Sequence, residues 1–262
     1  MECIPNSQAI GQLGVKMIKA DATGNTFIMM SEDVPGDDRS SWVKEQSFKE
    51  DGVIWVEQTS KGFAMDYYNR DGSNAALCGN GTRSVIAYLF KQGLISLDQW
   101  VTLTTASGEL MGKAVSPTEI MVSMPRPEGL ATVQWRGQSG MAVRVGVPHL
   151  VFTVDSWKQC KEWDLEACFR TFSAHSALPD GANVNCYAIE NHQVFNRTFE
   201  RGVERETLSC GTGCVATAWA IRQCIQPKQP SIPVHTKGGL LTIEVKEKTY
   251  FLKGKVELYE LV

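Results

Sequence analysis

Alternating hydrophobic and polar positions dominate the chain. Short runs of this alternation, rich in branched and aromatic residues and bounded by Gly, Pro, Asp and Asn, predict strands. The predicted strands are residues 61–69, 100–110, 119–125, 141–146, 149–154, 183–189, 193–200, 232–245 and 249–260. Helical spacing of apolar residues is clearest in 82–94 and 214–225, with weaker patterns near 39–48 and 164–173. This balance predicts an α+β fold in which strands surround a few helices.

Each of the two clear helices follows a cysteine-glycine turn. Cys78 precedes Gly-Asn-Gly in ALCGNGTRSVIAYL, and Cys210 precedes Gly-Thr-Gly in SCGTGCVATAWAI. Glycines at these positions let the backbone turn sharply and expose its N–H groups. A thiol at a helix N-terminus is expected to have a lowered pKa, because the unpaired N–H groups and the helix dipole favour the anion. A single cysteine at such a turn is usually a small buried residue with no catalytic role. The presence of two such cysteine-glycine turns indicates that the thiols take part in a reaction.

The two cysteine turns belong to a longer repeat. Cys78 and Cys210 are 132 residues apart, close to half of the 262-residue chain. After each helix comes a strand with a glycine turn, TLTTASGEL and PVHTKGGLL, and Thr105 and Thr236 in these segments are 131 residues apart. In both halves a strand that ends in Asn or Glu precedes the cysteine. We interpret this agreement as an internal duplication.

The duplication predicts two pseudo-symmetric domains, residues 1–126 and 127–262. Two prolines and a glycine in MPRPEGLAT interrupt the strand pattern and mark the boundary. A return of the last strand to the first domain is left open. The chain is long enough for each domain to bury its own core.

Composition narrows the function classes. A hydrophobic fraction of 43% and a net charge of −3 without a basic block indicate a soluble globular protein with no nucleic-acid partner. No apolar run reaches the ~20 residues of a membrane-spanning helix, and MECIPNSQAIGQLGVKM lacks a signal-peptide pattern, so a cytoplasmic protein without a membrane partner is expected. Eight cysteines in a chain of this length favour reduced thiols. No metal is expected, because the chain has no Cys-x-x-Cys and its four histidines are scattered.

Two thiols from two halves suit proton transfer. A pseudo-twofold repeat is expected to bring Cys78 and Cys210 to face each other, so that one removes a proton from a carbon and the other protonates its opposite face. Negative charge on a neighbouring carboxylate is then stabilised by backbone N–H groups at the two helix N-termini. These N–H groups are expected from Gly79, Asn80, Gly211 and Thr212. No signature of a pyridoxal-binding lysine is evident, so no cofactor is expected.

Several segments together resemble the diaminopimelate epimerase family of cofactor-independent, two-cysteine epimerases. The segments are TGNTF (23–27), NRDGSNAALCGNGTR (69–83), GVPH (146–149), DGANVN (180–185) and ERGVERETLSCGTG (200–213). The cysteine motifs alone also suit proline racemase relatives, whereas the segments before each cysteine are more specific to the epimerases. The resemblance implies two similar domains, each a β-barrel-like sheet around a central helix, and a homodimer whose substrate is an amino acid, a small molecule.

The resemblance also implies roles for individual residues. Cys78 and Cys210 match the catalytic pair. The cradle for the reacting carboxylate is implied at Gly79, Asn80, Gly211 and Thr212, with Asn25 beside it. The residues implied at the far end of the substrate are Asn69, Asn183, Glu200 and Arg201. His149 matches a family histidine near the site.

The chain departs from the family pattern at four places. Asp21 replaces the histidine of the opening motif, Asn74 replaces the acidic residue after Asp-Gly-Ser, and the segment from Glu200 to Cys210 is one residue longer than in many members. Val147 replaces an asparagine that helps to read the distal amino-acid group. Because valine can neither donate nor accept a hydrogen bond, we expect altered recognition at the distal end and unaltered chemistry at the reacting carbon.

The leading interpretation is interconversion of L,L- and meso-diaminopimelate, a precursor of lysine and peptidoglycan. A first alternative keeps the mechanism and changes the amino acid to glutamate, histidine or a broader set, and Arg201 favours a substrate with a distal carboxylate. A second alternative is a cysteine hydrolase or acyltransferase, which usually needs a histidine base beside the thiol. A third, a thiol redox protein, is disfavoured because redox cysteines are usually closely spaced.

Overall fold

The computed structural model describes residues 17–31, 38–74, 78–173, 178, 181–224 and 229–261. The chain divides into two compact units, Met1–Ile120 with Val256–Val262, and Met121–Lys255. The division falls a few residues before the boundary expected at 126, and the C-terminal residues belong to the first unit. No helix in these described ranges is long and apolar enough to cross a membrane.

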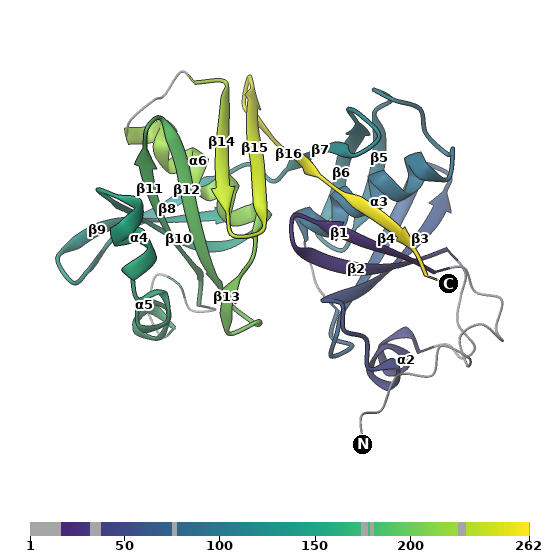
Figure 1. Ribbon diagram of the computed structural model, residues 1–262, viewed down its shortest axis with the longest axis horizontal. Helices are drawn as coiled ribbons and strands as arrows, with labels where there is room; N and C mark the ends of the chain where they lie inside the picture. Colours follow the sequence, from purple (N-terminus) through teal and green to yellow (C-terminus); the bar gives the residue numbers. More distant parts are fainter. Residues whose placement is uncertain are drawn as a thin grey trace. The chain divides into compact units, whose positions relative to one another are not determined.

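Unit 1 is a mixed sheet around one central helix (Figure 1). Its strands are β1 (Met17–Ala22), β2 (Asn25–Met30), β3 (Gly52–Thr59), β4 (Gly62–Asn69), β5 (Val101–Thr105), β6 (Gly108–Ala114) and β17 (Glu257–Glu260), and β7 (Glu119–Met124) crosses into unit 2. Its helices are α2 (Arg39–Gln46) and the central α3 (Gly79–Lys91). The strands pair in the order β17, β1, β2, β3, β4, β5, β6, with β2–β3 and β4–β5 parallel and the other pairs antiparallel.

Unit 2 repeats this arrangement. Its strands are β8 (Glu128–Trp135), β9 (Gln138–Val145), β10 (Val147–Val154), β11 (Asn183–Glu190), β12 (Gln193–Glu200), β13 (Arg205–Thr207), β14 (Ser231–Thr236), β15 (Gly239–Lys246) and β16 (Thr249–Lys255). Its helices are α4 (Trp157–Glu162), α5 (Leu165–Phe172) and the central α6 (Gly211–Cys224). The pairing order is β8, β9, β10, β11, β12, β14, β15, β16, and again only β10–β11 and β12–β14 are parallel.

The strand register is the same in the two units for β3 to β6 and for their counterparts β11, β12, β14 and β15. In unit 1, Phe63 on β4 pairs with Leu103 on β5. In unit 2, Val194 on β12 pairs with Val234 on β14, and each of these residues lies 131 positions after its counterpart. Register fixes which face of a strand each side chain occupies. The predicted fold class, two pseudo-symmetric domains from an internal duplication, is therefore confirmed.

The turn before the second cysteine is one residue longer than the turn before the first. Tyr68 on β4 bridges to Asn74 across a turn, and the equivalent pair in unit 2 is Phe199 with Glu206, on β12 and β13. The second turn is one residue longer and includes 201–204. This turn carries Arg201, so the two units differ in backbone length next to a predicted substrate-binding side chain.

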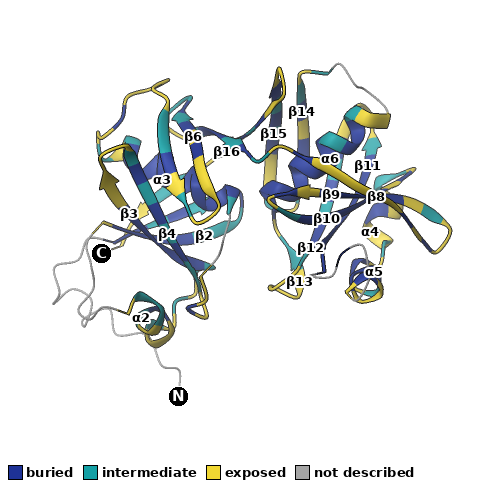
Figure 2. Cartoon of the chain, turned by 180° about the vertical axis from the view of Figure 1, so that it is seen from behind, coloured by how far each residue is buried: buried dark blue, intermediate teal, exposed yellow. Residues whose placement is uncertain are grey.

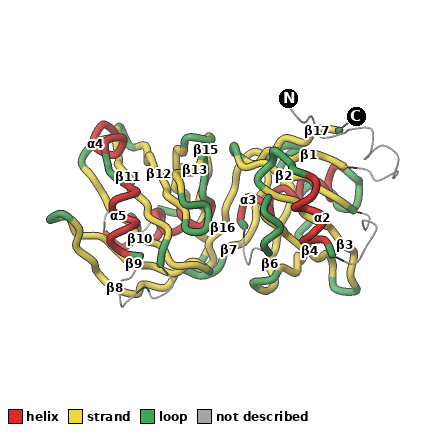
Figure 3. The backbone as a smooth tube through the Cα atoms, turned by 90° about the horizontal axis from the view of Figure 1, so that it is seen from below, coloured by secondary structure: helices red, strands yellow, loops and turns green. Residues whose placement is uncertain are grey.

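The two central helices are buried along most of their length (Figure 2), and in α3 the burial includes polar and charged side chains such as Asn80 and Arg83. Helix α3 packs on β1, β2 and β6, and α6 packs on β9, β10, β11 and β15. Figure 3 shows α3 among the strands of its own unit. Because the first turn of each helix is inside its sheet, the turn that follows each cysteine is held by surrounding strands.

The peripheral helices lie in equivalent crossover connections between parallel strands in the two units. Helix α2 connects β2 to the parallel β3, and α4 with α5 connects β10 to the parallel β11. Each begins at a side-chain cap, with Asp38, Ser156 and Asp164 accepting from a backbone N–H in the first turn. The pattern predicts α2 and α5 but not α4, because a six-residue helix is too short to show a helical period.

Four strands of ordinary length, β1, β2, β3 and β8, are also missing from the predicted set. In β2 the last four residues are all buried, so no alternation marks it. A tight turn joins it to β1, in which Thr23 and Gly24 have φ values of 61° and 82°. Asp21 accepts the Gly24 N–H at 2.7 Å there, so this departure from the family motif serves as a turn cap.

Candidate active site

Cys78 caps the N-terminus of α3. Its backbone is extended, with φ −137°, and its Sγ accepts the N–H of Gly81 at 3.3 Å. A Cβ on Gly81 would lie 2.9 Å from the Met65 Cε and 3.1 Å from the Ile54 Cδ1, so these two side-chain ends would have to shift. The helix therefore approaches β3 and β4 closely, and a backbone N–H points at the sulfur as predicted from the glycine turn.

Asn25, at the start of β2, lies beside this thiol. Its Oδ1 is 3.7 Å from the Cys78 Sγ and accepts from the Asn80 Nδ2 at 3.3 Å. Its Nδ2 donates to the Asp51 Oδ2 at 2.9 Å, which fixes the amide orientation. The buried Arg83 donates to the Asn80 Oδ1 at 2.8 Å. The predicted residues Asn25, Cys78, Gly79 and Asn80 are thus brought together, and the sequence missed the supporting Asp51 and Arg83.

Asn69 ends β4, as the strand prediction requires, but its side chain is engaged in the local turn. Its Oδ1 accepts from the Tyr67 hydroxyl at 2.9 Å, and its Nδ2 donates to the Ser73 Oγ at 3.0 Å. The backbone N–H of Asn69 also donates to the Ser73 carbonyl. In this structure Asn69 therefore stabilises the turn that leads to the cysteine.

Cys210 occupies the equivalent position before α6 and is 5% exposed. Its Sγ is 3.4 Å from the Thr212 hydroxyl. Burial, together with the negative charge of Glu200, raises the pKa of the Cys210 thiol well above its ordinary value, although the Thr212 hydroxyl and the Gly213 N–H favour the anion. The sequence prediction of a lowered pKa was therefore wrong for Cys210: the helix N-terminus acts as expected, but desolvation outweighs it.

The other predicted residues of unit 2 lie at the ends of β10, β11 and β12. Asn183 begins β11, and its Oδ1 accepts the backbone N–H of Arg201 at 2.8 Å. Glu200 ends β12 and accepts from the Thr207 hydroxyl at 2.5 Å. His149 on β10 is opposite Asn183 in the parallel register and is fully buried. Gly211 and Thr212 form the first turn of α6.

Val147 is the first residue of β10 and is half-buried. It pairs with Val145 across the β9–β10 hairpin, two residues before His149. Val147 therefore lies at the same end of β10 as His149, which pairs with Asn183 on β11.

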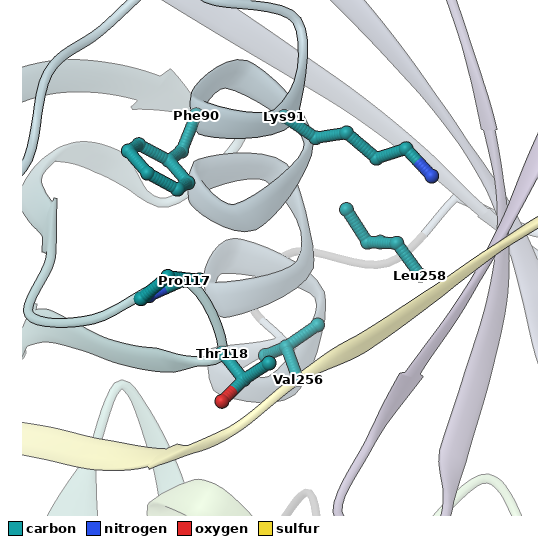
Figure 4. A pocket seen from close by; sticks show the side chains of 6 residues that line it. All are labelled: Phe90, Lys91, Pro117, Thr118, Val256 and Leu258. Carbon is teal, nitrogen blue, oxygen red and sulfur yellow. The ribbon is translucent and has the colours of Figure 1, made fainter.

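A separate pocket lies at the opposite end of α3. Its lining residues are Phe90, Lys91, Pro117, Thr118, Val256 and Leu258 (Figure 4). Phe90 and Lys91 lie in the last turn of α3, whereas Cys78 precedes the first. This pocket is therefore separate from the turn that carries Cys78.

Solved structures match this architecture. The chain resembles a PhzF-family phenazine biosynthesis protein from Bacillus anthracis, with a TM-score of 0.74 and 15% identity over 95% of this chain and 99% of that one. It also resembles a probable proline racemase from Agrobacterium radiobacter, with a TM-score of 0.69 and 13% identity over 95% and 93% of the two chains. The chain therefore shares its fold with these two proteins.

Sequence comparison narrows this group to one family. The family model for diaminopimelate epimerase matches residues 10–128 and 141–259, two stretches whose bounds are each 131 residues apart. A diaminopimelate epimerase from Thermotoga maritima is 37% identical over 90% of this chain and 96% of its own length. One from Archaeoglobus fulgidus is 31% identical over 92% of each. The chain belongs to the diaminopimelate epimerase family, and it is an isomerase.

Proposed function

We propose that this protein interconverts L,L- and meso-diaminopimelate by moving protons between the α-carbon and two thiols, Cys78 and Cys210, without a cofactor. The observation that carries the proposal is the equivalence of the two cysteines. Each precedes a Gly-Xaa-Gly turn at the N-terminus of the central helix of its unit. The names of the sequence relatives support the substrate.

The reaction needs one proton acceptor and one proton donor on opposite faces of the α-carbon. In the proposed step a thiolate takes the α-proton and becomes a thiol, while the second thiol protonates the other face and becomes a thiolate. The pair ends with as many protons as it began with, and the carbon is inverted. The raised pKa of the Cys210 thiol supports its being the protonated member in the free protein.

Charge that develops on the α-carboxylate needs donors that are already in place. The first turns of α3 and α6 offer backbone N–H groups for this role, and anions are stabilised at such helix N-termini. We assign the contact to Gly79, Asn80, Gly211 and Thr212. Asn25, which is hydrogen-bonded to Asn80, holds the first of these turns beside the Cys78 sulfur.

We assign recognition of the distal end to Asn69, Asn183, Glu200 and Arg201. A guanidinium is a planar donor fork that suits a carboxylate, so Arg201 favours an amino acid with a second carboxylate. Val147 favours a second candidate function, racemisation of a shorter dicarboxylic amino acid such as glutamate. With no polar atom on this side chain, an analogue without the distal amine leaves no buried partner unpaired.

The proposal includes a cytoplasmic location and a homodimer, and the family resemblance implies the homodimer. Sedimentation analysis over a range of protein concentrations tests the dimer. A species with the mass of one chain at every concentration contradicts it.

The substrate is identified by α-proton exchange in deuterated water with a panel of amino acids. We expect deuterium at the α-carbon of L,L- and meso-diaminopimelate, slower exchange with L- and D-glutamate, and none with L-lysine, which has no distal carboxylate. Exchange also separates this function from a cysteine hydrolase, which would release an acyl product. Absence of exchange with every dicarboxylic amino acid contradicts the proposal.

A further inference from the structure

A chain of polar side chains runs through the interior of unit 2. Five residues, each at most 3% exposed, form it: His149, Asn185, Asn196, Thr198 and Thr217. The Thr217 hydroxyl donates to the Asn196 Oδ1 at 3.1 Å, and the Asn196 Nδ2 donates to the Thr198 Oγ1 at 3.1 Å. The Thr198 hydroxyl donates to the Asn185 Oδ1 at 2.8 Å, and the Asn185 Nδ2 lies 3.1 Å from the His149 Nδ1. We call these five residues the polar relay.

The orientation of the Asn185 amide is fixed by a backbone carbonyl. The Asn185 Nδ2 lies 3.0 Å from the Leu150 carbonyl oxygen, which can only accept. A flipped amide would place an oxygen against this carbonyl, so the nitrogen must be on this side. Its second hydrogen is directed to the His149 Nδ1, which must therefore accept.

The proton of the neutral imidazole then resides on Nε2. Burial and the positive charge of Arg201 lower the pKa of His149 to about 3, so the ring is neutral at physiological pH. Because Nδ1 accepts from Asn185, the ring hydrogen is on the other nitrogen. The His149 Nε2 is buried and has no hydrogen-bond partner within the described part of the chain. An unpaired buried donor of this kind is costly and calls for an acceptor.

The polar relay lies directly behind the thiol-bearing turn of α6. A Cβ on Gly213 would be 2.4 Å from the Asn185 Oδ1, 3.0 Å from the Thr198 Oγ1 and 3.3 Å from the Cys210 Cβ. The other end of the relay, Thr217, is on the same helix one turn later. The relay is thus held between α6 and the strands that carry His149 and Asn185.

We propose that Asn185 is a positioning residue that fixes His149 as its Nε2–H tautomer, so that the ring presents a buried N–H donor to a carboxylate oxygen of the bound amino acid. A carboxylate suits a donor that lies within the field of Arg201. The tautomer does not depend on the proposed function, whereas the identity of the acceptor rests on it. The two parts are therefore tested by separate measurements.

The tautomer is read from ¹⁵N-histidine-labelled full-length protein by NMR, which reports which ring nitrogen carries the hydrogen. The chain has four histidines, and the signal that disappears in His149→Gln assigns the one of interest. We expect Nε2–H in the wild type without any ligand. A protonated Nδ1 in the wild type overturns the proposal, whatever happens to the variants.

Asn185→Asp reverses the polarity of the contact with little change of shape. Its carboxylate can only accept, so at mildly alkaline pH we expect the hydrogen of His149 to move to Nδ1. Thr198→Val is the matched control, because it interrupts the polar relay but leaves the Leu150 carbonyl to orient Asn185, and Nε2–H should be kept. Retention of Nε2–H in Asn185→Asp, or its loss in Thr198→Val, contradicts the assignment to Asn185.

The acceptor is tested with meso-diaminopimelate as the probe. We expect its addition to shift the Nε2–H proton resonance of the wild type downfield, and we expect kcat/KM of Asn185→Asp to fall about 10- to 100-fold, the effect of losing a hydrogen bond to a charged group. An unmoved resonance under saturating ligand, or an unchanged kcat/KM in a variant whose tautomer has switched, overturns the role of this donor.

Discussion

The Oδ1 of Asn25 lies 3.7 Å from the Sγ of Cys78, although the two residues are 53 positions apart in the sequence. The Asn25 amide is held by Asp51 on its nitrogen side and by Asn80 on its oxygen side. An uncharged acceptor, the Asn25 Oδ1, therefore faces the thiol. The Asp51 carboxylate contacts the nitrogen of the same amide, so Asn25 lies between this carboxylate and the thiol. The amide oxygen accepts from the Cys78 thiol, and because it is neutral it disfavours the thiolate less than a carboxylate at the same position would.

Asn25→Asp should make Cys78 less reactive. A carboxylate beside the sulfur disfavours the thiolate, so the rate of alkylation of Cys78 by iodoacetamide should reach its half-maximal value at a higher pH than in the wild type. The rate is followed by mass spectrometry of the Cys78 peptide. Asn191→Asp, in the exposed β11–β12 turn, is the control and should leave the profile in place. Identical profiles for wild type and Asn25→Asp contradict this reading of the contact.

Gly213→Ala should destabilise the protein more than Gly81→Ala. A Cβ on Gly213 meets the Asn185 Oδ1 at 2.4 Å, and this amide is held by three hydrogen bonds, whereas a Cβ on Gly81 meets only the ends of two flexible side chains. Overpacking of this kind costs about 1–3 kcal/mol. Urea unfolding measures both variants, and equal losses would show that the Asn185 amide can move freely.

Stability at acid pH should depend on His149. Its pKa is about 3 in the folded protein and about 6.5 when unfolded, so the unfolded state binds the additional proton below about pH 6.5. The free energy of unfolding should therefore fall with falling pH between about 6.5 and 3, by up to ~1.4 kcal/mol per pH unit from this group, and should be unaffected by it above that range.

His149→Gln should have a shallower slope in this window, and His192→Gln, in the exposed β11–β12 turn, should keep the slope of the wild type. Denaturant unfolding at a series of pH values compares the three proteins. A slope for His149→Gln that equals the wild-type slope would show that the histidine can be protonated in the folded state.

Val147→Asn should shift the substrate preference toward diaminopimelate. An asparagine supplies a polar partner for the distal amine, worth about 1–3 kcal/mol if buried, and it penalises substrates that lack this amine. The ratio of kcat/KM for diaminopimelate and glutamate, measured in both proteins, should rise in the variant. Val145→Asn, the partner across the hairpin, is the comparison, and an unchanged ratio in Val147→Asn removes this residue as a specificity element.

The fold could be predicted from two kinds of spacing in the sequence, the alternation within strands and the distance between repeated motifs. Strands that alternate, such as β4, and the repeat that relates Cys78 to Cys210 could be read directly, because both depend on local pattern. Strand β2 could not, since consecutive buried residues show no alternation. Helix α4 was not predicted, because its six residues are too few to show a helical repeat of apolar positions.

The chemistry of the site was only partly accessible from the sequence. Motif positions placed the two thiols before their helices, which the structure confirms. The raised pKa of Cys210 could not be predicted, because it depends on burial and on Glu200, which lies on another element. The polar relay was missed for the same reason: Asn185 is inside a quoted motif, but the direction of its amide is set by tertiary neighbours.

The central claim is that inversion needs both thiols. Cys78→Ala and Cys210→Ala are each assayed for conversion of L,L- to meso-diaminopimelate in deuterated water, with folding checked by circular dichroism. Positioned proton transfer contributes about 10²- to 10⁴-fold per group, so each variant should retain roughly a thousandth or less of the wild-type rate, and product made by the wild type should carry one deuterium at the inverted carbon. Wild-type inversion by either folded variant would contradict the two-thiol mechanism.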